Sequence, residues 1–289
     1  MADLIKKIRT SSGDSQIDYN ALANLPTISN PNLLINSDFR NPVNQRGNTS
    51  FTANAGDQSR KYWIDRWYIQ DGVTATKQNG YIKLTASASS EYGYFCQPLE
   101  QALENATYTI TINVKSVGIG STVYFKSGTS AYGKALVAGI NVITVSMSLS
   151  SVEIQLHPNS TIELYWIKLE RGTTSTAFVP RLIAEELMLC KRYFQIYNGD
   201  RFAVLTQTYT IATETNGRMN LPVEMRVKPS ITVYSFDVKQ INNGDTVTIT
   251  AKTGESISKD AINIKGTHAS TAVAPRYIYA KFAVDAEIY

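Results

Sequence analysis

Hydrophobic and polar residues alternate along most of the chain between residues 35 and 180. In the segment ATYTITINVKSV, one face carries Tyr108, Ile110, Ile112 and Val114, and the other carries threonine and asparagine. The segments VSMSL and SVEIQLHP repeat this pattern. Successive side chains of a β-strand point to opposite faces, so a period of two predicts strands with one buried face. Because glycine, asparagine and serine separate these short segments, the pattern predicts an antiparallel β-sandwich and not an alternating βα fold.

One segment has helical spacing instead. Ile183, Leu187, Cys190 and Phe194 recur at intervals of four, three and four, which places them on one stripe of a helix over residues 182–195. Acidic residues fall early in this segment and basic residues late, as the helix dipole favours. The sequence therefore predicts a linking helix whose apolar stripe packs either on the sandwich or on another chain.

The strand pattern returns after the helix. An Asn243–Gly244 pair predicts a tight turn, and RYIYAKFAVDAEIY predicts a final strand with Ile278, Ala280, Phe282, Val284 and Ile288 on one face. At the other end, residues 1–31 have too few apolar side chains to bury a core alone, which is typical of an arm that docks on a partner. We therefore expect four parts: an N-terminal arm (1–31), a β-sandwich domain (32–181), the linking helix (182–195) and a C-terminal β domain (196–289).

Composition narrows the class of protein. The 289 residues carry a formal net charge of +4, and the basic residues are scattered, so no stripe for nucleic acid is expected. No apolar run approaches transmembrane length, and residues 1–10 lack the apolar core of a signal peptide. We expect a protein made in the cytoplasm without a leader and not inserted into a membrane. Cys96 and Cys190 lie far apart in apolar settings, which does not favour a disulfide.

Residues for catalysis are scarce. His157 and His268 are the two histidines of the chain, and neither belongs to a GxSxG or HExxH motif. Glycoside hydrolysis needs only two carboxylates, and Asp38 and Asp65 are the candidates by composition. Nothing in the sequence brings these two together, so we expect no enzymatic activity.

Aromatic residues are the candidates for a ligand site. The segment YWIDRWYIQDG contains Tyr62 and Trp63, and loops or strand ends carry Tyr92, Tyr94 and Tyr132. Aromatic rings stack on the apolar faces of sugars, so these five could contact a saccharide. The alternative for YWIDRW is burial in the sandwich core, where aromatics contribute large apolar area.

Several segments follow one another along the chain: NLLINSDFRNPVNQRG at residues 32–47, then YWIDRW, IKLERG, AFVPRLIAEELMLCKRYF, LPVEMRVKPSITVYS and the ending FAVDAEIY. Together they resemble a family of bacteriophage and prophage tail proteins. In this family a jelly-roll domain similar to carbohydrate-binding modules precedes a helix and a smaller β domain. The resemblance implies a non-enzymatic tail fibre or receptor-binding protein of a phage or a phage-tail-like bacteriocin. It would be located in the tail of the particle and bind surface polysaccharide of a host bacterium.

The same resemblance implies further partners. Such proteins are commonly homotrimers, residues 1–31 would attach the chain to a tail or baseplate protein, and the C-terminal β domain would serve as receptor-binding head. A structural adaptor that contacts no host and a depolymerase that cleaves surface glycan are the alternatives.

One metal site is implied by the resemblance, because jelly-roll modules often hold a structural calcium near their first and last strands. Asn36, Asp38 and Glu170 occupy similar places here and offer oxygen ligands. In the alternative interpretation Asn36 and Asp38 cap turns, and Glu170 pairs with Arg46 or Arg171. No other cofactor is expected.

Overall fold

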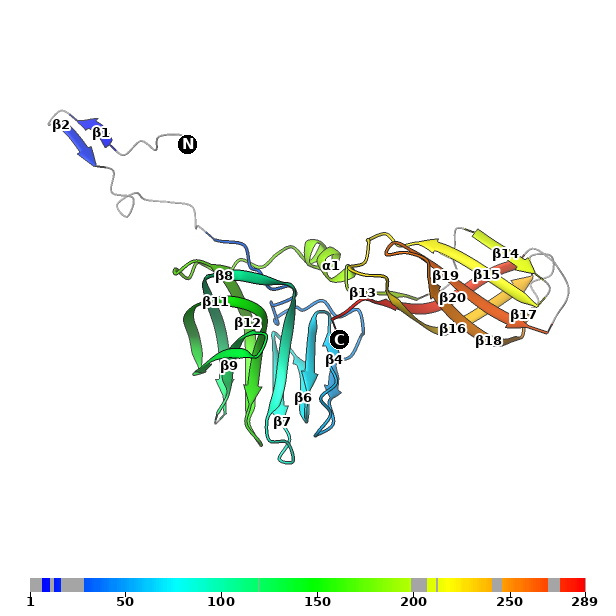
Figure 1. Cartoon of the computed structure of the whole chain (residues 1–289), viewed down its shortest axis with the longest axis horizontal. Coiled ribbons are helices and arrows are strands. Elements are labelled where there is room, and N and C mark those ends of the chain that lie inside the picture. The colour runs from blue at the N-terminus through cyan, green and yellow to red at the C-terminus, as the bar shows by residue number, and fades with distance from the viewer. Residues whose placement is uncertain are drawn as a thin grey trace.

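The computed structural model describes residues 7–10, 13–16, 29–118, 120–198, 207–211, 213–240, 246–269 and 276–288. In these residues the protein is mostly β, with antiparallel sheets and one short helix, so the predicted fold class is confirmed (Figure 1). In the N-terminal arm, β1 (Lys7–Thr10) and β2 (Gly13–Gln16) form an antiparallel hairpin. The other residues before 29, and the predicted Asn243–Gly244 turn, lie outside the described residues.

Two long strands build the sandwich. β8 (Gly93–Val117) pairs with β11 (Gly139–Leu156) along most of its length, and register shifts between Met147 and Ser151 divide the pairing into two parts. The first part of β8 and the second part of β11 belong to one layer, which also contains β4 (Lys61–Ile64), β5 (Trp67–Gln70), β9 (Thr122–Ser127) and β10 (Ser130–Ala135). The remaining parts of β8 and β11 belong to the second layer, with β12 (Thr161–Arg171), β7 (Tyr81–Ala86), β6 (Val73–Gln78) and β3 (Ser50–Thr52).

The core between the layers confirms the alternating pattern. Tyr108, Ile110, Ile112 and Val114 are buried together with the stacked rings of Trp67 and Phe95, whose centroids lie 4.7 Å apart. Thr109 and Thr111 of the same segment are buried as well, because residues 172–177 cover them from outside. Thr109 Oγ1 donates to the carbonyl of Gly172 at 2.8 Å.

The helix is shorter than predicted. α1 spans Ile183–Lys191, and Phe194 begins the strand β13 (Phe194–Tyr197), which pairs with the last strand of the chain. Among the helical residues of the predicted stripe, Cys190 is buried whereas Ile183 is 54% exposed. The prediction of one continuous helical stripe to Phe194 was therefore wrong, because strand pairing takes over at that residue.

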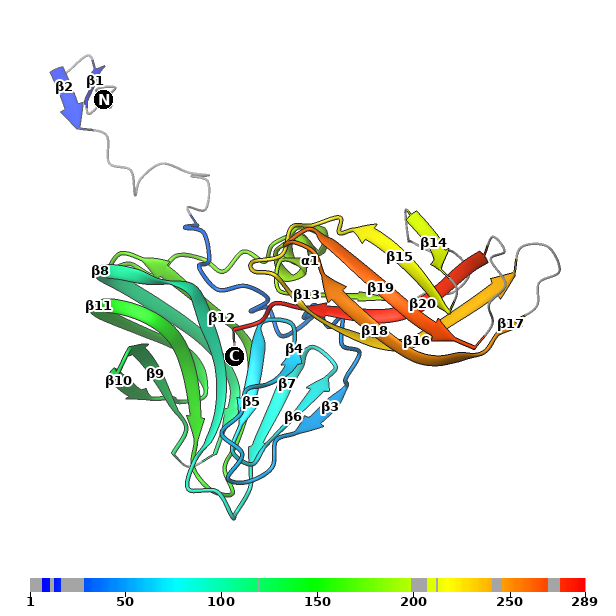
Figure 2. The same ribbon diagram turned by 45° about the vertical axis from the view of Figure 1, so that its right-hand side comes forward.

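The C-terminal part has a second core between two four-stranded sheets. One sheet has the order β13, β20 (Arg276–Asp285), β16 (Ser230–Gln240) and β17 (Thr246–Val247). The other has the order β14 (Gln207–Ile211), β15 (Glu214–Asn220), β19 (Ala261–His268) and β18 (Ile249–Ser256). Ile278, Ala280 and Phe282 of β20 are buried as predicted. Figure 2 shows this second sandwich extending from one end of the first, with α1 at the junction.

Buried charges join the two sandwiches. Arg66 Nη1 lies 2.6 Å from Glu287 Oε2, and the two side chains are 1% and 0% exposed. Arg46 pairs with Asp65 at 3.1 Å and with Asp285 at 3.4 Å. The guanidinium groups also lie over aromatic rings of the connection, as Arg66 does over Tyr193 at 3.6 Å. The end of the chain is thereby fixed to the first sandwich by groups that are more than 200 residues apart in sequence.

Candidate functional site

Tyrosines and polar side chains lie together on one outward surface of the first sandwich, on the layer that contains β5, β9 and parts of β8 and β11. On β8, β11 and β9 the inward residues Phe95, Ile154 and Phe125 are buried, so their neighbours in sequence face outward. Residues opposite each other in register share a side of the sheet. The outward residues, which we call the tyrosine face, are Gln70, Tyr92, Tyr94, Thr122, Tyr124, Lys126, Glu153, Gln155 and His157.

Two tyrosines of this face are half-buried, with their rings set apart. Tyr94 lies opposite Gln155 on the neighbouring strand, and Gln155 Nε2 donates to its hydroxyl at 3.4 Å. Tyr124 lies one strand further across, opposite Glu153. Strand geometry separates Tyr94 and Tyr124 by about 10 Å across the sheet and about 7 Å along it. The face therefore offers two aromatic surfaces with amide and hydroxyl groups between them.

A charged pair lies beside these rings. Lys126 Nζ lies 2.6 Å from Glu153 Oε2 and 5.8 Å from the centroid of the Tyr94 ring. Burial acts to lower the pKa of Lys126, but the hydrogen bond and the charge of Glu153 outweigh it, so the pKa is raised. The ammonium group stays protonated at neutral pH and, with its side chain 36% exposed, can reach a ligand.

One end of the tyrosine face is closed by the end of the chain. Tyr62 Oη donates to the carbonyl of Ile288 at 2.6 Å, and Arg60 donates to the same oxygen at 2.9 Å. Beneath this cover, Tyr62, Tyr68 and Cys96 form a small buried cluster. Burial raises the pKa of the Cys96 thiol, which therefore stays neutral. The accessible part of the face runs from Tyr94 and Tyr124 toward Tyr92.

Of the five aromatic residues that the sequence suggested, the structure places two on the tyrosine face and three elsewhere. Tyr92 and Tyr94 share the tyrosine face, and the Tyr92 ring meets His157 edge-on at 5.0 Å between centroids. Tyr62 lies under the closed end of the face, 7% exposed. Trp63 is 0% exposed, so its ring is enclosed by the core and offers no surface to a sugar. Tyr132 is 44% exposed but lies opposite Phe125, which places it on the other side of the sheet.

Sequence reasoning missed Tyr124, Lys126 and Gln155. The alternation in TVYFKS does place Tyr124 and Lys126 on one side of a strand, opposite the core residues Val123 and Phe125. That these two lie beside Tyr94 depends on the order of strands in the sheet, which the local pattern does not contain.

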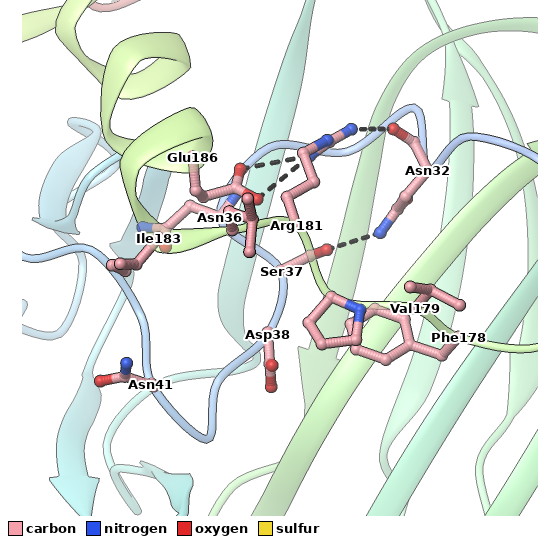
Figure 3. A pocket seen from close by; sticks show the side chains of 12 residues that line it. Asn32, Asn36, Ser37, Asp38, Asn41, Phe178, Val179, Arg181, Ile183 and Glu186 are labelled. Carbon is pink, nitrogen blue, oxygen red and sulfur yellow. Dashed lines mark hydrogen bonds and ion pairs between the residues drawn. The ribbon is translucent and has the colours of Figure 1, made fainter.

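A pocket of about 320 Å³ lies where α1 meets the first sandwich (Figure 3). Arg181 reaches from its rim to Glu186 at 3.2 Å and also donates to the backbone carbonyl of Asn32. Glu186 Oε1 accepts the backbone N–H of Asn36 at 2.5 Å. Because these polar groups bond to one another, they hold the helix to the sandwich and are not free for a ligand.

The residues suggested for calcium do not fit a metal site. Both polar atoms of the Asn36 side chain bond to backbone, with the amide donating to Val43 and Asp65 and the oxygen accepting from Val43. Asp38 forms an ion pair with Arg40 at 2.7 Å. Glu170 is 0% exposed and lies about 13 Å along β12 from Trp166, the bridge partner of Asp38.

The surroundings of Glu170 also serve the fold. Its carboxylate accepts hydrogen bonds from the backbone and hydroxyl of Thr176 at 2.9 and 2.6 Å. Burial acts to raise the pKa of Glu170, but these bonds and Lys168 outweigh it, so the pKa is lowered. Among the residues that the structure describes, no group of three or more His, Cys, Asp or Glu could hold a metal ion.

The carboxylates considered for catalysis are also separated. Asp38 is held at the surface by Arg40, whereas Asp65 is 0% exposed. Burial raises the pKa of Asp65 to about 6, although Arg46 and Gln45 act against this. Asp65 therefore cannot meet a substrate across an open cleft from Asp38.

In the described part of the chain, no helix is long and apolar enough to cross a membrane.

Comparison with known proteins gives only distant likenesses. No family model matches the chain, and no curated protein matches it. A family 29 carbohydrate binding module is similar to it at 10% identity, over 46% of this chain and 98% of the module, with a TM-score of 0.30. Discoidin II of Dictyostelium discoideum is similar at 9% identity, over 72% of this chain and 82% of its own, with a TM-score of 0.20.

The adhesin domain of Epf from Streptococcus pyogenes is also similar, at 10% identity, over 87% of this chain and 97% of its own, with a TM-score of 0.29. TM-scores of 0.30 and below carry no argument about the fold or the ligand of this chain.

Proposed function

We propose that this chain is a non-enzymatic adhesion protein whose tyrosine face binds polysaccharide on a bacterial surface. The observation that carries the proposal is the pair of half-buried rings, Tyr94 and Tyr124, with Gln155 between their strands. Flat aromatic rings cover the apolar faces of sugars, and amide and hydroxyl groups bond to sugar hydroxyls. Because the rings stand about 10 Å apart across the sheet, the face fits a chain of several sugars better than one.

Attachment to a phage or phage-tail-like particle completes the proposal. It rests on the sequence resemblance to tail proteins, which also supports a homotrimer bound to a tail or baseplate protein through residues 1–31. A shallow face binds each glycan weakly, and three copies on one particle would raise the overall affinity by raising the effective concentration. An open binding face with no deep pocket is sufficient for such a protein.

A substitution in the tyrosine face tests the binding role. Tyr124→Ala removes one ring from the face and should weaken binding to surface polysaccharide roughly tenfold, as truncation of a central interface tyrosine does. Tyr132→Ala is the matched control, because Tyr132 is exposed on the opposite side of the same sheet. Binding of the full chain is measured by affinity electrophoresis in gels that contain the polysaccharide. Equal retardation of the two variants would refute the assignment of this face.

A further inference from the structure

The second sandwich carries another exposed face, on the outward side of β16 and β20. The inward residues of these strands, such as Phe236 and Ile278, are buried in the second core. The neighbouring outward positions hold Asp237 and Lys239 on β16, and Tyr279 and Lys281 on β20. Lys239 and Lys281 are exposed and Tyr279 is partly exposed.

Lysines and tyrosines alternate along this face. Lys239 Nζ lies 5.9 Å from the centroid of the Tyr279 ring, and Lys281 Nζ lies 5.9 Å from that of Tyr234. Tyr234 sits at a register shift of β16 and is 47% exposed. We call the four residues Lys239, Tyr279, Lys281 and Tyr234 the lysine–tyrosine ladder. It combines ring surfaces with positive charges and lies on a different sandwich from the tyrosine face.

The spacing of the charges favours a polymer over a small anion. Tyr279 is opposite Asp237 in register, and each lysine lies two residues from that pair, in opposite directions. The lysines are therefore about 14 Å apart along the strands, with Tyr279 between them. This exceeds the Debye length of about 8 Å at physiological salt, so a small anion that pairs with one lysine is largely screened from the other.

We propose that the lysine–tyrosine ladder binds a linear anionic polysaccharide. Its carboxylate or phosphate groups would pair with Lys239 and Lys281, and its sugar rings would lie on Tyr279 and Tyr234. Asp237 sits beside Tyr279 and disfavours an acidic group at the centre, so the anionic groups bind at the two ends of the ladder. Single exposed ion pairs contribute little, and affinity arises because one chain engages both lysines.

The test uses the full chain and polymers that differ in charge or in backbone. Polygalacturonate, its methyl ester and single-stranded DNA are compared as probes by biolayer interferometry at low and at physiological salt. A ribitol-phosphate teichoic acid that carries N-acetylglucosamine rings is added to separate phosphate from carboxylate recognition. The variant Lys239→Gln/Lys281→Gln changes exposed side chains of the ladder, and Lys259→Gln changes an exposed lysine elsewhere in the same sandwich.

We expect polygalacturonate or teichoic acid to bind, and whichever binds more tightly identifies the anionic group. The double variant should weaken that binding about tenfold, from a few-fold per lysine, whereas Lys259→Gln leaves it unchanged. The methyl ester should bind less tightly than polygalacturonate, because it lacks the carboxylates that pair with the two lysines. Binding of neither anionic glycan would overturn the proposal, as would equal binding of the methyl ester, equal binding of DNA, or equal loss in the Lys259 variant. The ladder is judged by the difference between the two lysine variants and the tyrosine face by the difference between Tyr124→Ala and Tyr132→Ala, so the two proposals fail separately.

Discussion

Removal of one buried charge at the junction gives the sharpest test of how the chain is held together. Glu287 comes from the end of the chain, and its side chain is 0% exposed beside Arg66 of the first sandwich, which is 1% exposed. Arg66 also donates to the carbonyl of Pro98 and lies over Tyr193. Glu287→Gln keeps the shape of the side chain and removes its charge. Arg66 then loses its ionic partner while it remains enclosed.

The size of the effect follows from this enclosure. Breaking a buried ion pair by changing one partner costs about 3 to 5 kcal/mol, because the other charge stays buried without compensation. Glutamine can still accept one hydrogen bond from the guanidinium, which offsets about 1 kcal/mol. Burial also raises the pKa of Glu287 against the action of Arg66 and Arg46, so ionised Glu287 is itself held at a cost. We therefore expect Glu287→Gln to lower the free energy of unfolding by about 3 kcal/mol, the lower end of this range.

Urea unfolding measures this loss. Trp63 and Trp67 report on the first sandwich by fluorescence, and far-UV circular dichroism reports on all strands. Glu104→Gln is the control, because Glu104 and its partner Arg171 are each 66% exposed and such a pair contributes under about 1 kcal/mol. If the free energies of unfolding of Glu287→Gln and of the unchanged protein differ by less than about 1 kcal/mol, the Arg66–Glu287 ion pair does not hold the junction as described.

Two further predictions concern titration and thiol chemistry. Burial raises the pKa of Asp65 from 3.8 to about 6, so the folded state holds this proton more tightly than the unfolded chain. This stabilisation is complete below the unfolded pKa and is lost as the pH rises through the folded one. The free energy of unfolding should therefore fall by about 1 kcal/mol from about pH 5 to about pH 7, and a rise over this window in urea titrations would contradict it. Cys96 and Cys190 are free and buried, and burial raises the pKa of both thiols. They should react with Ellman's reagent only in denaturant, and rapid labelling of the native protein would show that these sites open.

The sequence predicts what depends on neighbouring residues. The alternation of Tyr108, Ile110, Ile112 and Val114 specifies a strand and its buried side, because both follow from a period of two. The predicted end of α1 was wrong because it depends on a residue that is distant in sequence. Phe194 has the right spacing for a helix, yet its pairing with Asp285, 91 residues away, places it in a strand.

The segment NLLINSDFRNPVNQRG is rich in asparagine for reasons that only the structure reveals. Asn36 has a φ of 56°, a backbone conformation that asparagine tolerates better than most residues, and its side chain bonds to the backbone of Val43 and Asp65. Arg46 and Gln45 of the same segment both bond to Asp65. The segment thus connects the first sandwich to the junction. Contacts of this kind join distant parts of the chain, so the sequence does not reveal them. By its composition alone, the segment resembles a loop that binds a metal or a ligand.

Saturable binding to a bacterial surface is the measurement that tests the proposed function most directly. The labelled full chain is added to whole cells of a broad panel of strains and to their purified surface polysaccharide, beside an assay for newly released reducing ends. We predict saturable binding without release of reducing ends, and weaker binding by Tyr124→Ala than by Tyr132→Ala. Steady release of reducing ends would identify a depolymerase, and absence of binding across the panel would favour a structural adaptor; either result would contradict the account.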